Sequence, residues 1–162
     1  RRLRRKAYNI QKILDHSLFT IEDLSFNSIF IRANSHLRQI TKSIQEEIPH
    51  DLDQRMKKSE KAFEELWDPY SGQYYSRDFI THRLLKVPTI ATLLPLYAGT
   101  ISKERANHLV ELLEDQEAFG LEYPVPSVPK NSDWFQPKRY WQGPSWVNTN
   151  WLIIEGLLEY GY

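Results

Sequence analysis

The sequence predicts an all-α fold of antiparallel helical hairpins with one short β-hairpin. The first observation is that apolar residues return at every third or fourth position along several segments, which is the spacing of an amphipathic helix. The second is that these segments end at turns or prolines, so that helix follows helix as in an α/α fold. The third is that strand-like residues are confined to one stretch, residues 73–84. We therefore expect five or six main helices and one hairpin.

Composition narrows the function classes. The chain has 162 residues, enough for one domain with a substantial core. Lys plus Arg and Asp plus Glu both number 21, so no net field points to nucleic acid or membrane as the partner. No apolar run approaches the length that spans a bilayer. The absence of cysteine excludes disulfides, thiolate metal sites and cysteine nucleophiles, and it suits a cytoplasmic location.

The first segment, from Arg1 to Leu18, is expected to be one amphipathic helix. Its apolar residues follow helical spacing: Leu3, Ala7, Ile10, Leu14 and Leu18. The segment starts with a strongly basic stretch that ends at Lys6. Because no aromatic residues or further basic clusters accompany this stretch, a solvated helix start is favoured over a nucleic-acid or localisation patch.

Two further helices are expected between Asp23 and Trp67. The second helix should follow the break at Asp23–Asn27 and run to about Ile48, where Pro49 stops it. Its apolar stripe is Phe30, Ala33, Leu37, Ile40, Ile44 and Ile48. Asp51 should cap the third helix, which turns inward Leu52, Met56, Phe63, Leu66 and Trp67. The charged residues at this joint lack a metal-ligand spacing and are interpreted as helix-end charges: Glu46, Glu47, His50, Asp51 and Asp53.

A turn and a hairpin are expected next. Asp68–Gly72 has strong turn character, Gln73–Arg77 should form a short strand, and Phe79–Leu84 is its possible partner. Four side chains of this stretch could line a pocket rim, although support of the neighbouring helices is the favoured role: Tyr74, Tyr75, Arg77 and Asp78.

A fourth and a fifth helix follow. The fourth, opened by Pro88, should run from Thr89 to Tyr97, with Pro95 kinking or shortening it and Gly99 ending it. Ser102 should cap the fifth helix, which extends to about Asp115 and buries Ala106, Leu109, Val110 and Leu113. The long, Pro-rich connection Gln116–Arg139 leads into an aromatic motif. A connection of that length is usually functional or disordered, so it is expected to form part of a pocket.

The aromatic motif occupies Arg139–Trp151. It mixes three Trp and one Tyr with amide and hydroxyl side chains, a combination that suits a carbohydrate, because rings stack on C–H faces and amides reach hydroxyls. Gly143 and Pro144 indicate a loop that leads into a helix from Ser145 to about Glu159. Apolar residues cover most of that helix, which is therefore expected to be buried: Trp146, Val147, Trp151, Ile153, Ile154, Leu157 and Leu158.

The same stretch carries a family resemblance. Tyr-Trp-x-Gly-Pro-x-Trp from Tyr140, followed by Asn-x-Asn-Trp-Leu-Ile from Asn148, resembles glycoside hydrolase family 63 and its trehalase-like relatives. Within that group it is most similar to the mannosylglycerate-hydrolase-like and α-glucosidase branch, and Tyr123–Val128 is similar to the family's approach to the motif. The resemblance is good from Trp67 onward and weaker before it. One departure is Gln142, where the family usually has Arg.

The resemblance implies a fold and a domain organisation. The family's fold is an (α/α)6 toroid with a central substrate pocket, and its twelve helices need more than 162 residues. We therefore expect residues 1–162 to be a single partial catalytic domain, an incomplete toroid segment. A chain that starts Arg1-Arg2 without Met and stops at Gly161-Tyr162 fits a fragment. Apolar helix flanks left without neighbours should be exposed and could pair with a second copy.

Seven residues are the candidates for sugar binding. Tyr140, Trp141 and Trp146 should supply stacking surface, and Gly143 belongs to the loop beside them. Gln142, Asn148 and Asn150 should hydrogen-bond to sugar hydroxyls, although Asn148 or Asn150 could instead brace the loop. Trp151 is expected in the core.

No catalytic residue is assigned. The family's enzymes invert the anomeric centre with a carboxylic acid and a carboxylate base, and the resemblance places the acid before this chain and the base after it. Of the carboxylates present, Asp78 follows the hairpin and Asp133 lies in the loop. Glu155 is the best alternative, because a Glu on a buried helix can have a raised pKa and act as an acid, although a partnered structural carboxylate is its favoured role. We therefore expect an inactive fragment of an inverting glycosidase for α-glucosides or α-mannosides, without metal or cofactor. The alternative is a non-enzymatic helical interaction domain with a Trp-rich binding surface.

Overall fold

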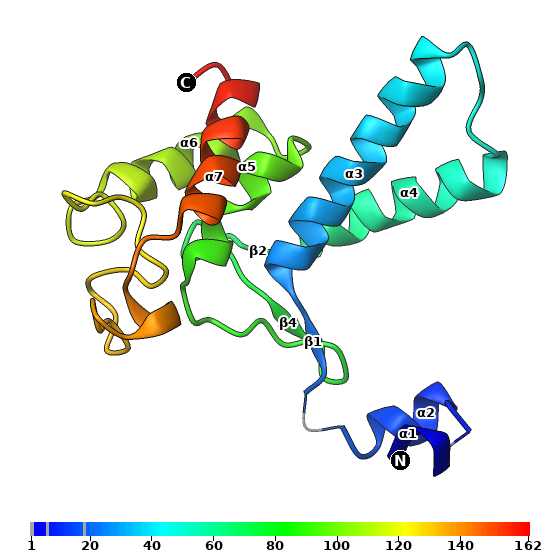
Figure 1. The fold of residues 1–162 in the computed structure, drawn as a ribbon, viewed down its shortest axis with the longest axis horizontal. Helices are drawn as coiled ribbons and strands as arrows, with labels where there is room; N and C mark the ends of the chain where they lie inside the picture. Colours follow the sequence, from blue (N-terminus) through cyan, green and yellow to red (C-terminus); the bar gives the residue numbers. More distant parts are fainter. Residues whose placement is uncertain (1, 6, 18) are drawn as a thin grey trace.

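The computed structural model describes residues 2–5, 7–17 and 19–162. Its N-terminal part is two short helices, α1 (Arg2–Arg5) and α2 (Ile10–Leu14), which lie apart from the other helices (Figure 1). The predicted single helix is wrong, because Ala7 and Tyr8 adopt positive φ angles of 48° and 53° that a helix does not allow. The Asn9 side chain then caps α2. Arg1, Lys6 and Leu18, which belonged to the predicted helix, lie outside the described residues.

A helical hairpin follows, formed by α3 (Leu24–Ser43) and α4 (His50–Phe63) and projecting from the rest of the molecule (Figure 1). Asp23 caps α3 by accepting the Phe26 N–H. The helix ends five residues before the predicted Ile48, because Gln45 adopts a φ of 59° and the Glu46 N–H returns to the Thr41 carbonyl.

Helix α4 begins one residue before the position predicted for its cap. Its N-cap is Pro49, not Asp51, and Asp51 lies in the first turn, where its charge favours the helix dipole. Met56, Phe63 and Leu66 are buried as predicted, whereas Leu52 is exposed. Arg38 of α3 binds Asp53 and Glu60 of α4, so ion pairs hold the two helices together.

The apolar stripe predicted for α3 is on the wrong face. Most of its members are exposed: Phe30, Ala33, Leu37, Ile40 and Ile44. The buried face is instead Leu24, Ser28, Ile31 and Asn34, which includes two polar residues. Ser28 fits this position because its hydroxyl donates to the Leu24 carbonyl at 2.7 Å. Among the described residues, no helix covers the more apolar side.

The strands are short and pair differently from the prediction. Strand β2 (Trp67–Asp68) follows the 3-10 turn η1 (Glu64–Leu66) and pairs with β3 (Gln73–Tyr74) across the predicted turn. Strand β4 (Arg77–Asp78) pairs with β1 (Ile21–Glu22). The expected partner of β3, Phe79–Leu84, contributes only a single bridge from Leu84 to Arg77. The turn decided the pairing, because Gly72 at a φ of 65° returns the chain onto Trp67.

The next two helices confirm their sequence signals. The predicted fourth helix is a 3-10 turn, η2 (Ile90–Leu93), followed by α5 (Pro95–Ala98), so Pro95 divides it as expected. Gly99 ends α5 at a φ of 72°. The Ser102 side chain caps α6 (Lys103–Glu114), and Ala106 and Leu109 are buried. Residues 115–139 form the connection that leads to η3 (Tyr140–Gln142) and α7 (Val147–Glu159).

Helix α7 packs closely on α5. A Cβ on Gly156 would lie 2.5 Å from the Tyr97 nitrogen, so only glycine allows this approach. Arg32 of α3 binds Glu159 of α7 and lies over the Tyr97 ring, which joins the three helices. The prediction that α7 is buried all round is wrong, since α5 covers only one face. Its other face is apolar but exposed, and it includes the predicted core residue Trp151: Val147, Trp151, Ile154 and Leu158.

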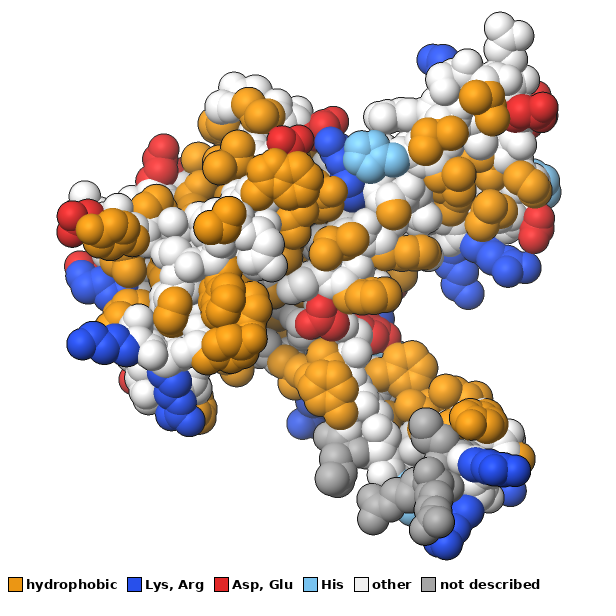
Figure 2. All heavy atoms as spheres, viewed as in Figure 1, with side chains coloured by type: hydrophobic (Ala, Val, Ile, Leu, Met, Phe, Trp, Pro, Cys, Tyr) orange, Lys and Arg blue, Asp and Glu red, His pale blue; other side chains and the backbone are white. Residues whose placement is uncertain are grey.

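One core holds these elements together. It joins α3, α5, α6 and α7 with the connection after α6, through buried residues such as Leu24, Leu93, Leu96, Leu109, Phe119 and Ile153. The all-α class is confirmed, and the helices form a segment of a toroid rather than a closed bundle. The expected exposed apolar surface is present, and Figure 2 shows hydrophobic side chains gathered over α7 and along α3. Among the described residues, no helix is long and apolar enough to cross a membrane.

Candidate functional site

The predicted aromatic residues form one cluster at the junction of η3 and α7. The rings of Trp141 and Trp146 stack with centroids 4.6 Å apart and planes 19° apart. Tyr140 packs edge-on against Trp146 at 5.1 Å. The Trp146 indole also donates to the Tyr140 carbonyl at 3.4 Å. One face of Trp141 is therefore covered by Trp146.

The loop between η3 and α7 is tightly enclosed. Gly143 is buried, and a Cβ at this position would lie 2.5 Å from the Gln136 carbonyl oxygen, so glycine is required. Beside it, the Oε1 atom of Gln142 is buried and has no hydrogen-bond partner among the described residues. Such an orphan acceptor is uncommon and marks a place where a further donor belongs.

The two asparagines of α7 differ in position. Asn150 braces the preceding loop: its Oδ1 accepts the Val125 N–H at 2.7 Å, and its Nδ2 donates to the carbonyls of Val125 and Trp146. Asn148 makes no such contact and lies on the surface of a cavity. Of the two roles considered for these residues, Asn150 has the bracing one and Asn148 is free to meet a ligand.

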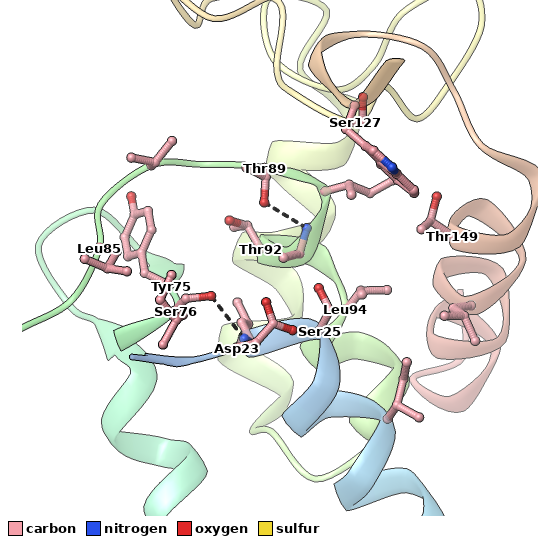
Figure 3. A pocket seen from close by; sticks show the side chains of 18 of the residues that line it. Asp23, Ser25, Tyr75, Ser76, Leu85, Thr89, Thr92, Leu94, Ser127 and Thr149 are labelled. Carbon is pink, nitrogen blue, oxygen red and sulfur yellow. Dashed lines mark hydrogen bonds between the residues drawn. The ribbon is translucent and has the colours of Figure 1, made fainter. Parts of the chain in front are cut away.

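The cavity has a volume of about 560 Å³ and lies where α3, η2 and α7 begin. Trp141 and Asn148 of the seven predicted residues line it. Hydroxyl groups lie around it, as Figure 3 shows for several of them: Ser25, Ser76, Thr89, Thr92, Ser127 and Thr149. Leu24, Ile90 and Leu152 add apolar surface. An apolar cavity with convergent hydroxyl, amide and indole groups is the ordinary form of a small-molecule site.

The electrostatics of the cavity favour an uncharged ligand. Asp23 is the single charged residue among the described residues that line it, and its carboxylate already accepts the Phe26 N–H at 2.7 Å. No Lys or Arg of the described chain lines this cavity. The described residues therefore offer a bound anion no cationic partner there, whereas hydroxyl groups of a ligand find many donors and acceptors.

The carboxylates that the sequence offered as catalytic candidates do not line the cavity. The Oδ1 atom of Asp78 accepts hydrogen bonds from the Ile80 and Thr81 N–H groups and the Thr81 hydroxyl, and the bonds from Thr81 lower the pKa of this carboxyl most. This acid is a turn anchor. Asp133 is exposed, and neither it nor Glu155 lines the cavity. No group of three His, Cys, Asp or Glu side chains in the described parts of the chain is placed to hold a metal.

The four hairpin residues considered for a pocket rim lie in different environments. Tyr75 lines the cavity. Tyr74 is buried against Phe63 and Trp67, its hydroxyl accepts from Arg105, and burial raises its pKa. Arg77 binds Glu22 and Glu65. The hairpin therefore mainly supports its neighbours, with Tyr75 as the exception.

Sequence reasoning missed Asp23, Ser25, Thr92 and Ser127 as cavity residues. Asp23 and Ser25 lie in the stretch that was expected to be a break before the second helix, whereas Asp23 is the N-cap of α3 and Ser25 lies in its first turn. Thr92 lies within an apolar segment, and Ser127 lies between prolines. The one available signal was the Pro-rich loop itself, which was expected to form a pocket and does so through Ser127.

Comparison with known proteins matches the chain to one family of glycoside hydrolase domains. The family of mannosylglycerate hydrolase MGH1-like glycoside hydrolase domains matches residues 1–162. Mannosylglycerate hydrolase from Thermus thermophilus is 37% identical over 161 residues, which are 98% of this chain and 38% of that protein. Mannosylglycerate hydrolase MGH2 from Selaginella moellendorffii is 33% identical and aligns with 99% of this chain and 33% of its own length. The chain thus spans less than two fifths of these relatives.

Solved structures agree. The crystal structure of the GH63 mannosylglycerate hydrolase from Thermus thermophilus in complex with glucose superposes with a TM-score of 0.87 at 37% identity, over 98% of this chain and 38% of that one. Neutral trehalase Nth1 from Saccharomyces cerevisiae superposes with a TM-score of 0.71 at 22% identity, over 88% of this chain and 29% of that one, which shows a shared fold.

Proposed function

Because the chain belongs to the family of mannosylglycerate hydrolase MGH1-like glycoside hydrolase domains, we propose that it is part of the catalytic domain of an inverting glycosidase. The substrates are α-mannosides or α-glucosides, and this part contributes one side of the sugar subsite. The observation that carries the proposal is that Trp141 and Asn148 line the same cavity, among hydroxyl groups.

The chemistry of the cavity supports a sugar ring as its ligand. A pyranose has apolar C–H faces and a polar rim, and the cavity offers the Trp141 ring together with Asn148, Ser25, Thr92 and Thr149. Each sugar hydrogen bond replaces one to water and nets about 0.5–1.5 kcal/mol, so ring contacts carry much of the affinity. The Thermus relative was solved in complex with glucose and with D-glycerate, which supports a sugar glycoside as substrate. The uncharged sugar ring is the part that suits this cavity, because the described residues that line it offer no cationic partner to a glycerate carboxylate.

The reacting carboxylates belong to other parts of the domain. Inversion needs an acid and a base roughly 6.5–9.5 Å apart, with room for water between them. Asp23 is the lone carboxylate lining the cavity in the described chain, and it caps α3. One carboxylate that already accepts a hydrogen bond as a helix cap cannot supply both the acid and the base. The 162 residues alone therefore bind sugar without hydrolysing it.

Hydrolysis of α-mannosylglycerate and of trehalose by the full-length protein tests this proposal. Proton NMR of the mannose first released from α-mannosylglycerate should show the β-anomer, since the reaction inverts an α-linkage. Trehalose reports turnover only, because its leaving glucose is α whatever the mechanism. The same assay on residues 1–162 should show no turnover. Initial formation of α-mannose from α-mannosylglycerate would contradict inversion, and turnover by residues 1–162 that is lost in Glu155→Gln would overturn the placement of the catalytic groups.

A matched pair of variants tests the sugar subsite. Trp141→Ala removes a ring that lines the cavity, whereas Trp134→Ala removes an exposed ring that does not. Titration with methyl α-mannoside should show binding weakened about tenfold or more in the first variant and unchanged in the second. Equal effects of the two substitutions would place the sugar elsewhere.

A further inference from the structure

Ser127 connects three segments around the cavity. Its N–H donates to the Pro144 carbonyl at 3.2 Å, and its carbonyl accepts the Ile90 N–H at 3.0 Å. Its Oγ accepts the Gly143 N–H at 3.0 Å. The residue thus joins the Pro-rich connection to the start of η2 and to the Gly-Pro loop that follows Trp141.

The two residues that precede Ser127 are also held in place. Asn150 holds both backbone groups of Val125, and Pro126 forms a bridge with Ser145. The serine is only 2% exposed, yet it lines the cavity, and Figure 3 shows it opposite Asp23 and Ser25. The backbone at Ser127 is therefore held by contacts with the Gly-Pro loop and with Asn150 of α7.

The Ser127 hydroxyl has an unused donor. A hydroxyl carries one O–H donor and two acceptor lone pairs. The Gly143 N–H occupies one lone pair, and across the described residues the Ser127 O–H donates to no acceptor. A buried hydroxyl leaves its donor unused at a cost unless water or a ligand accepts it.

We propose that the Ser127 hydroxyl is a sugar-binding group that donates a hydrogen bond to one hydroxyl of the bound ring. Ser127 lines the cavity, and the bond from the Gly143 N–H leaves the Ser127 O–H free to donate to a ligand. The group that binds the sugar is therefore also the group that holds the Gly143 loop in register with η2. This inference rests on the proposed function, because it needs a sugar in this cavity.

The test compares Ser127→Ala with Ser145→Ala in the full-length protein. Ser145 makes a side-chain hydrogen bond between the same two segments, from its Oγ to the Tyr123 carbonyl at 2.7 Å, but it does not line the cavity. Both variants and the wild type are titrated with methyl α-mannoside and its four monodeoxy analogues. The loss of one neutral hydrogen bond should weaken binding of methyl α-mannoside to Ser127→Ala about three- to tenfold.

The deoxy analogues distinguish a direct bond from Ser127 to the sugar from an indirect effect of Ser127 on the loop. If Ser127 donates to one sugar hydroxyl, the analogue lacking that hydroxyl binds the wild type and Ser127→Ala equally well, while the other three keep the difference. Ser145→Ala should match the wild type with every analogue. Should Ser127→Ala fail to fold, Ser127→Cys serves in its place, because its thiol keeps the approximate shape and is a weak donor.

Each outcome decides the proposal. Equal weakening with all four analogues would show that Ser127 only supports the loop and would overturn the contact. If the wild type and Ser127→Ala bind methyl α-mannoside equally tightly, the contact is also overturned, but the proposed function remains intact. A wild type that binds no glycoside would refute the proposed function and this inference together.

Discussion

Asn148 and Asn150 are two positions apart in α7, yet Asn150 is hydrogen-bonded to the backbone while Asn148 lies on the surface of the cavity. Asn150→Ala removes three hydrogen bonds to the backbone of Val125 and Trp146. We expect it to lower the free energy of unfolding by about 1–3 kcal/mol, because the Val125 N–H is left without its partner. Urea denaturation followed by circular dichroism measures this loss.

Asn148→Ala is the matched control. Its side chain is exposed and braces nothing, so stability should change by less than about 0.5 kcal/mol. Its sugar affinity should fall instead. If the two substitutions destabilise the protein equally, the division of roles between the asparagines is wrong.

Asp78 makes the fold sensitive to acid. Hydrogen bonds from Thr81 and Ile80 lower the pKa of this carboxyl below its ordinary value of 3.8. A lowered pKa in the folded state adds stability above the unfolded pKa, and that stability is lost as the pH falls through the folded pKa. Asp78→Ala should therefore be less stable than the wild type near neutral pH, and the difference should shrink below pH 3.8. Urea midpoints measured from neutral pH to about pH 2 would show the two curves converging; parallel curves would contradict the assignment.

At the scale of elements, the contact of α7 with α5 depends on one glycine. Replacing glycine by alanine inside a helix normally stabilises it by up to about 1 kcal/mol. At Gly156 the sign should reverse, because the new methyl would meet the Tyr97 nitrogen at 2.5 Å. We expect Gly156→Ala to destabilise the protein by about 1–3 kcal/mol, the usual cost of overpacking.

The comparison variant is Leu158→Ala on the exposed face of the same helix. Leu158 is 62% exposed, so its truncation should cost little. Thermal unfolding of the two variants gives the difference directly. A stabilised Gly156→Ala would mean that α7 does not lie this close to α5.

Elements with local signals could be predicted from the sequence. Ser102 caps α6, Pro95 divides the fourth helical segment, and Gly99 ends α5, as expected. Each of these depends on the chemistry of one residue and its immediate backbone. The end of α3 was missed because Gln45 takes a left-handed conformation that its side chain does not announce. Strand pairing was missed because it depends on which distant segment reaches β4.

Which face of a helix is buried could not be predicted locally, because it depends on how the whole molecule packs. Apolar content predicted the wrong side of α3, since Ser28 and Asn34 are buried while Phe30 and Ile40 are exposed. Trp151 was assigned to the core on the same reasoning. For the candidate site, Trp141 and Asn148 of the motif lie on one cavity, but Asp23 and Ser127 come from segments more than a hundred residues apart. No local pattern relates them.

The exposed faces of α3 and α7 lead to the last prediction, that residues 1–162 alone pair with a second copy. On α3, Phe26 is 73% exposed and Ile40 56%, and Ile44, the C-cap of this helix, is 62% exposed. Soluble monomers seldom expose contiguous apolar patches above a few hundred Å², and association removes such surface from water at about 25 cal/mol per Å². Sedimentation of residues 1–162 should show concentration-dependent dimers, and a hydrophobic dye should bind.

The double substitution Ile40→Glu with Ile44→Glu places two charges on this face, so it should shift the protein to monomer and reduce dye binding. Gln39→Glu, a charge added to an exposed position of the same helix outside the stripe, should leave both unchanged. A wild-type fragment that is monomeric at every concentration and binds no dye would refute the pairing.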